Sequence, residues 1–187
     1  MSSSNLAVRS MHDLGLAAWF GGSLMGATGL NGATSQAVDP RERLSLSSIG
    51  WKLWTPWQIG AIGVHAIGGV GLFAGNRHRL MVQEQARTNS AVKTVLTVAA
   101  AGVTAYSGML GRTVEQHQEE GALGATEPGV AGSDSLSSAQ RQLKLLQWAV
   151  PVLTGALIIL GAQQGEQQRS SGASVDARTV DPVTADD

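Results

Sequence analysis

The sequence predicts an all-α, polytopic membrane protein with four transmembrane helices in an up-down bundle. Asp, Glu, Lys and Arg are missing from four long stretches, residues 14–38, 53–76, 94–111 and 145–165. An apolar helix of about 20 residues crosses the hydrocarbon core of a bilayer. The chain also has 24 glycines in 187 residues, and small residues are typical of helices that pack closely in lipid. A soluble bundle would carry charges on its outer faces, whereas these stretches are uncharged on all sides.

The composition excludes several classes of function. A net charge of −1 gives no reason to expect nucleic-acid binding. The absence of cysteine excludes disulfides, thiolate metal sites and cysteine nucleophiles. The sequence contains no nucleotide-binding, serine-hydrolase or zinc-protease motif. We therefore expect no enzymatic activity, no catalytic residues, no metal site and no cofactor.

The predicted transmembrane domain covers residues 1–162, and a disordered cytoplasmic tail follows over 163–187. Its four helices are expected at about 11–31, 56–75, 91–111 and 143–162. The residues Ser10-Met11-His12-Asp13 have the capping-box pattern of a helix start. A cleaved signal peptide is the alternative interpretation of the first helix, but its apolar stretch is long for such a segment.

Three tryptophans precede or open the second predicted helix. Trp51, Trp54 and Trp57 are interpreted as interfacial anchors, because indoles prefer the boundary between headgroups and hydrocarbon. Thr55-Pro56 matches an N-cap followed by proline at the first helical position. A loop is therefore expected over 32–55.

The remaining connections suggest an orientation. A short basic connection is expected over 76–92 and a longer loop, rich in Gly, Ser and acidic residues, over 112–142. Basic residues favour the cytoplasmic side, and their density in the short connection predicts that both termini are cytoplasmic, in a multi-pass protein of the cell membrane. Pro151 predicts a kink in the fourth helix.

Glycines recur at helical spacing in the first two predicted helices. Gly22 and Gly26 are four residues apart, and Gly68 and Gly71 lie on one side of the second helix. Such stripes let helix backbones approach closely. They indicate either packing within the chain or an oligomer interface built on Gly22-x-x-x-Gly26, and the sequence does not separate the two.

His65 is the one ionisable residue expected at membrane depth, so it is a functional hypothesis. One interpretation is a proton relay or haem ligand. The other is a neutral imidazole that bonds a hydroxyl such as Ser23 or Thr104. Helix geometry puts His12 roughly 15 Å from the level of His65, so the two are not expected to hold one haem.

Two further polar groups have simpler explanations. His12-Asp13 with Trp19 suggests a ligand site, but an acidic residue at a helix start also stabilises the helix by itself. Glu115 and Glu119 share one helix face and His117 points away, which is poor spacing for a metal. With Glu120, they are interpreted as a solvated acidic loop.

Two segments resemble a known group of proteins. The stretch from His12 to Gly22 is similar to the first helix of four-helix integral membrane proteins of high-GC bacteria whose function is unknown. The stretch Thr104-Ala105-Tyr106-Ser107-Gly108-Met109-Leu110-Gly111-Arg112 resembles their third helix. This resemblance implies a fold and a membrane address, but no activity. A His followed by Trp-x-Gly-Gly also resembles copper-resistance D type membrane proteins, but the chain lacks their further membrane His and Met ligands.

The function expected from these observations is non-enzymatic. We expect a scaffold or accessory subunit that associates through Gly-rich helix faces. Its partners would be the lipid bilayer and either a second copy or a larger membrane complex. A small transporter or channel-like protein that uses His65 is the alternative, and a haem or redox protein is the second alternative.

Overall fold

The computed structural model describes residues 3–82 and 84–179. These residues form four long helices, and no strand occurs among them. In chain order the elements are α1 (Ser3–Met25), the π-helical η1 (Gly26–Leu30), α2 (Asn31–Thr34), α3 (Pro40–Val82), α4 (Glu84–Gln116), the 3₁₀-helical η2 (Gln118–Glu120) and α5 (Asp134–Thr179). The predicted helical class is confirmed.

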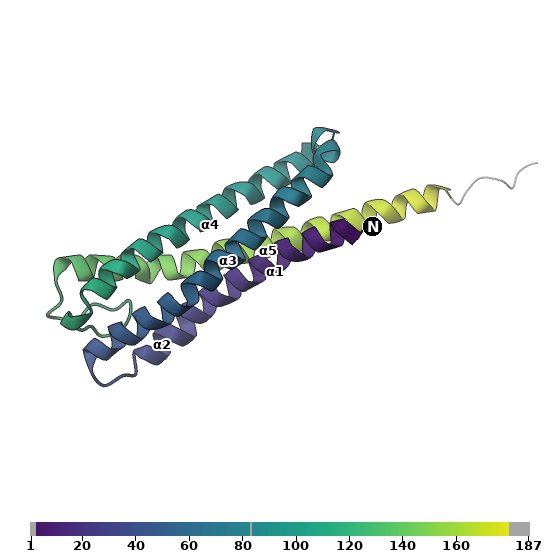
Figure 1. Ribbon diagram of the computed structural model, residues 1–187. Helices are drawn as coiled ribbons and strands as arrows, with labels where there is room; N and C mark the ends of the chain where they lie inside the picture. Colours follow the sequence, from purple (N-terminus) through teal and green to yellow (C-terminus); the bar gives the residue numbers. More distant parts are fainter. Residues whose placement is uncertain (1–2, 83, 180–187) are drawn as a thin grey trace, which may run out of the picture.

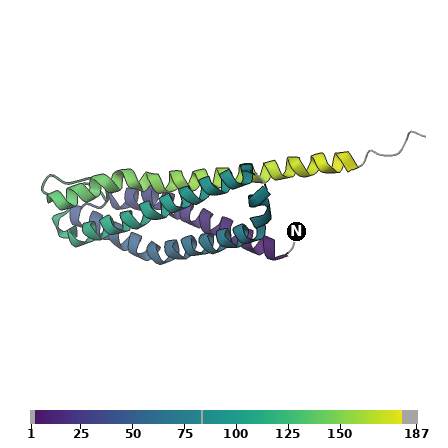
Figure 2. The same ribbon diagram turned by 90° about the horizontal axis from the view of Figure 1, so that it is seen from above.

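The long helices lie side by side in two closely packed pairs. Helix α1 packs along α3, and α4 packs along α5. Further contacts join α1 to α5 and α3 to α4. Figure 1 shows the chain turning back after α2, at the α3–α4 connection and again after η2, and Figure 2 shows the end of α5 reaching beyond the other helices.

Helix α3 starts at Pro40, so the predicted start at Pro56 is wrong. The Asp39 side chain caps the helix, because its Oδ1 accepts a hydrogen bond from the N–H of Arg41 at 2.9 Å. Pro40 then takes the first helical position, where its missing N–H costs nothing. Thr55-Pro56 has the same residue pattern but lies inside the helix. There the Thr55 hydroxyl donates to a carbonyl one turn earlier at 2.8 Å.

The other long helices also extend past their predicted bounds. Helix α1 begins at Ser3 instead of 11, α4 covers 84–116 instead of 91–111, and α5 covers 134–179 instead of 143–162. The reason is that hydropathy marks only the apolar part of a helix, whereas backbone hydrogen bonds continue into polar turns. The predicted tail over 163–187 therefore begins too early, because α5 continues to Thr179. Residues 180–187 of that predicted tail lie outside the described residues.

Two hydrophobic cores hold these helices together. The central core is formed where all four long helices meet, around Trp19, Ala61, Ala100 and Leu157. The second lies at the end of the molecule that carries η2, where Leu44 and Leu136 are fully buried beside Ala122 of the connecting loop. The loop between α4 and α5 is therefore part of the packed structure.

Three helical segments are long and apolar enough to cross a membrane. Within the described part of the chain these are Pro40–Gly75, Arg87–Gln116 and Asp134–Glu166. They indicate a membrane protein. The first predicted span, on α1, is not among them, because α1 ends at Met25 and any stretch of it long enough to span includes Arg9, His12 and Asp13.

Candidate functional site

His65 lies inside the protein, where α1 crosses α3 at close range. Its side chain is 3% exposed. The approach depends on glycine: an added Cβ at Gly15 would lie 2.5 Å from the His65 backbone nitrogen, and one at Gly68 would lie 2.7 Å from the Cα of His12. The rings of His12 and His65 consequently lie with their centroids 4.1 Å apart. The predicted separation of about 15 Å is wrong, because it places His12 at the end of the first helix, whereas α1 begins at Ser3 and His12 lies beside Gly68 of α3.

The hydrogen bonds of this histidine pair show that the Nδ1 atom of each ring acts as a donor. His65 Nδ1 lies 2.9 Å from the backbone oxygen of His12, and a carbonyl only accepts, so His65 Nδ1 carries the proton. His12 Nδ1 likewise donates to Asp13 Oδ1 at 3.0 Å. The rings of Trp19 and His65 lie edge to face, with their centroids 6.3 Å apart. Helix α1 thus contacts one face of the His65 imidazole and accepts a hydrogen bond from its Nδ1.

The hydroxyls proposed as partners of His65 are engaged elsewhere. Thr104 accepts a hydrogen bond from the indole nitrogen of Trp19 at 3.2 Å. Ser23 accepts a bond of 3.4 Å from Gln58. The expectation that His65 bonds one of them is wrong, because the crossing of α1 and α3 supplies a closer carbonyl.

The two neighbouring histidines do not fit a haem held between them. Their contact distance leaves no room for a macrocycle between the two rings, and His65 Nδ1 is already bonded. Among the residues that the structure describes, no group of three or more His, Cys, Asp or Glu side chains is arranged to hold a metal ion. The geometry instead makes this pair a polar contact that fixes the register of α1 on α3.

The glycines predicted to serve helix packing all lie against other residues of the same chain, and Gly68 lies against the backbone of His12. Gly22 lies against the Trp54 ring and Gly26 against the Trp51 ring, while Gly71 faces Val8. Gly22-x-x-x-Gly26 therefore packs against α3 of the same chain, which is the first of the two interpretations left open by the sequence. Of the three tryptophans, Trp57 is the most exposed, at 73%.

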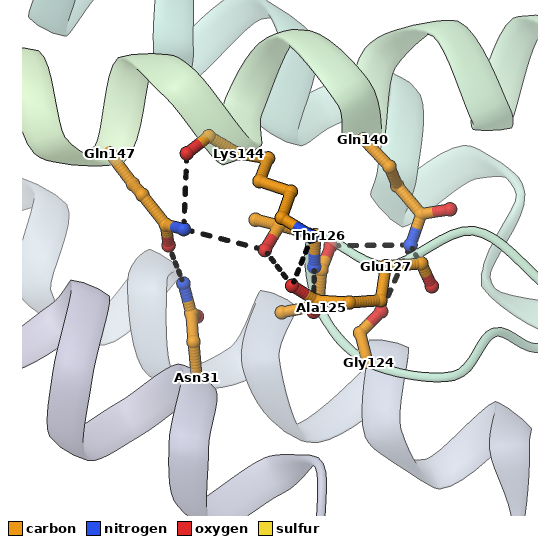
Figure 3. A network of polar contacts seen from close by, with 8 residues as sticks. All are labelled: Asn31, Gly124, Ala125, Thr126, Glu127, Gln140, Lys144 and Gln147. Atoms are coloured by element: carbon orange, nitrogen blue, oxygen red, sulfur yellow. Dashed lines mark hydrogen bonds and ion pairs between the residues drawn. The ribbon is translucent and has the colours of Figure 1, made fainter.

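A second polar cluster lies near the opposite end of α1. Asn31 Oδ1 accepts hydrogen bonds from Trp51 Nε1 at 3.0 Å and from Ser47 Oγ at 3.2 Å. Its Nδ2 donates to Gln147 Oε1 at 3.0 Å, and Gln147 Nε2 in turn donates to the Thr126 hydroxyl at 3.5 Å (Figure 3). One asparagine after the π-helical turn thus joins α2, α3, α5 and the loop that precedes α5. Sequence reasoning missed this residue because it stands inside an uncharged stretch without a motif.

The loop between η2 and α5 is held by side chains that reach its backbone. Gln140 Nε2 donates to the carbonyls of Gly124 and Ala125 at 2.9 and 3.3 Å (Figure 3). From the other side, Arg43 donates to Leu123 O at 3.2 Å. Gly121 turns the chain with φ of 72°, a conformation that favours glycine. Residues 117–133 are therefore a packed cap, and the prediction of a loop over 112–142 is wrong in extent, because α4 ends at Gln116 and α5 starts at Asp134.

The acidic residues near this cap serve as structural partners. Glu115 pairs with Lys52 at 2.5 Å, and His117 contacts Ser135 at 3.0 Å. Glu120 Oε2 accepts a bond of 2.6 Å from the N–H of Ser133. This bond, helped by His117, outweighs desolvation and lowers the pKa of the Glu120 carboxyl below its usual value.

Replacement of Asn31 by Ala is expected to lower the free energy of unfolding by about 2 kcal/mol, because Trp51 and the buried Ser47 lose their acceptor. Ser47→Ala, which removes one donor, should cost less than half as much. Thermal unfolding in neutral detergent, followed by circular dichroism, measures both. Gln36→Ala on the exposed surface is the matched control, and a loss as large as that of Asn31→Ala would contradict the importance of this cluster.

Comparisons with protein families, with curated proteins and with solved structures gave no match for this chain. Among the described residues, the geometry offers a buried His65 in contact with His12, a polar cluster around Asn31 and a large exposed apolar surface on the long helices.

Proposed function

We propose that this chain is a four-span protein of the cell membrane, folded as an up-down bundle with both termini in the cytoplasm. Three apolar helices support the membrane address. Helix α1 packs along α3 and also contacts α5, and its Leu14 and Met25 are 69% and 63% exposed. A helix that is packed between two spanning helices and carries large apolar side chains on its outer side fits the same depth in lipid.

The orientation is supported by the basic residues near one end of the helices. Arg77, Arg87 and Lys93 lie around the α3–α4 connection, at the end of the molecule where α1 starts (Figure 1). Arginine and lysine accumulate on the cytoplasmic side of membrane proteins. The N-terminus then lies in the cytoplasm, and the packed cap of 117–133 faces the opposite side.

We further propose that the chain acts as a non-enzymatic scaffold or accessory subunit and binds its partner through α4. The outer face of α4 carries this proposal, because only 6% of its most apolar stretch is buried within the chain. At Gly102 and Gly108, an added Cβ would meet nothing within 4 Å. Exposed Val98 and Met109 flank these glycines. Small residues beside apolar ones are the surface that another membrane helix approaches most closely.

The proposal predicts an assembly that depends on Gly102. Native mass spectrometry of the protein extracted gently from its own membranes should detect a homo-oligomer or a co-purifying subunit. Gly102→Leu should reduce that assembly about tenfold or more, since a bulky side chain separates the helices. Gly21→Leu is the matched control, because Gly21 is equally open but lies on α1. A bare monomer from native membranes, or an equal loss in both variants, would contradict the accessory role.

A further inference from the structure

A cavity of about 510 Å³ opens between α1, α4 and α5, with Leu72 of α3 at its side. Its walls are divided by polarity. Arg9, Asp13 and Lys93 give it a charged end, and Leu16, Leu157 and Ile158 give it an apolar part. This volume lies in the range of ligand sites in proteins. The division by polarity fits a molecule with one charged end and one hydrocarbon end.

The charged end of this cavity has an excess of positive charge. Arg9 and Asp13 are four residues apart on α1 and so share a face. Lys93 of α4 comes close enough to both for electrostatic interaction. Its ammonium group also donates to the side-chain oxygen of Gln164 on α5, which fixes the lysine at the cavity. Two cations and one carboxylate leave a formal charge of +1, which one monoanion balances.

The position of this end along the helices matches the level of lipid headgroups. Lys93 directly precedes the uncharged stretch of α4, and Gln164 stands at the end of that of α5. Where the helices span a bilayer, these residues lie at its surface, and Leu16, Leu157 and Ile158 lie deeper. This step rests on the membrane placement proposed above and is independent of the accessory role.

We propose that this cavity binds an anionic phospholipid with a single negative charge, with its phosphodiester between Arg9 and Lys93 and an acyl chain along Leu16 and Leu157. Basic pockets between membrane helices recognise phosphate headgroups in this way. A monoanionic diester matches the net charge of the cavity, whereas a zwitterionic lipid brings an ammonium group to a site that already holds two cations. The acyl chain accounts for the apolar part of the cavity.

The test uses the full-length protein in neutral detergent, titrated with phosphatidylglycerol or phosphatidylcholine of identical acyl chains. Native mass spectrometry should detect a preference of about tenfold for phosphatidylglycerol, as expected for charge-assisted hydrogen bonds. Lys93→Gln should remove this preference. Arg112→Gln, the same loss of charge at the other end of α4 and outside the cavity, should retain it. Equal binding of the two lipids, or an unchanged preference in Lys93→Gln, would overturn the proposal.

Two further experiments test whether a loss of binding reflects misfolding and whether the bound anion is a lipid or a free phosphate. Gly161→Leu fills the cavity without changing its charge, because an added Cβ there meets nothing within 4 Å, and it should weaken lipid binding while the protein stays folded. Inorganic phosphate should not compete at millimolar concentration, and competition would overturn the lipid assignment in favour of a free anion. Lipid binding is read separately for monomer and oligomer. A bare monomer from native membranes that still prefers phosphatidylglycerol would contradict the accessory role alone, and an assembly from native membranes without that preference would overturn the lipid site alone.

Discussion

Replacement of Trp19 by Ala is expected to lower the free energy of unfolding by about 3–5 kcal/mol, the usual loss when a large buried aromatic side chain is truncated. Trp19 is 0% exposed and lies in the central core with residues from all four long helices. Truncation leaves a cavity that no single helix can close, because closing it on one side opens it on another. Thermal unfolding in neutral detergent, followed by circular dichroism, gives the loss. Trp57→Ala is the control, since this indole is 73% exposed and its removal should change stability by less than about 1 kcal/mol.

Two milder variants divide this effect into packing and hydrogen bonding. Trp19→Phe keeps most of the volume but removes the donor to Thr104, and should cost less than half of the loss in Trp19→Ala. Thr104→Val removes only the acceptor and leaves the buried indole N–H unpaired, at about 1–3 kcal/mol. If Trp19→Ala proved no more harmful than Trp57→Ala, the central core would not hold the helices together.

The helical class follows from the sequence because uncharged stretches of this length have few other structures available. The ends of the helices do not follow in the same way. Asp39-Pro40 and Thr55-Pro56 match the same N-cap pattern, and only the packing of the following residues decides which of them starts a helix. Trp51 and Trp54 illustrate why: their rings pack on Gly26 of η1 and Gly22 of α1, so α3 is already helical where the pattern predicts a loop.

The candidate site is predicted by residue type but not by contact. His65 stands out as the one histidine inside an uncharged stretch, and it lies inside the protein. Its partner could not be found from spacing, since the level at which two helices cross depends on where small residues let them meet. The sequence gives even less indication of the polar cluster around Asn31. Asn31 is one uncharged polar residue among many, and its partners lie 16 to 116 positions away.

Replacement of Gly15 by Ala is expected to lower the free energy of unfolding by about 3 kcal/mol, the upper end of the usual cost of overpacking. The new Cβ would lie 2.5 Å from the His65 nitrogen and 2.6 Å from the Ala61 oxygen. Both are backbone atoms of α3, so no rotamer change relieves the contact, and α1 must move away. Thermal unfolding in neutral detergent measures the loss. Gly21→Ala is the matched control on the same helix, because its Cβ meets nothing within 4 Å.

A second replacement at the crossing of α1 and α3 should act on the same contact. Gly68→Ala creates a contact with the backbone of His12 and should also separate α1 from α3. Once one alanine has moved the helices apart, the second meets a gap that already exists. The double variant should therefore lose less stability than the two single losses together, with a coupling of about 0.5–3 kcal/mol. Strict additivity would mean that the two glycines relieve separate contacts, and the crossing of α1 and α3 would then not be one rigid interface.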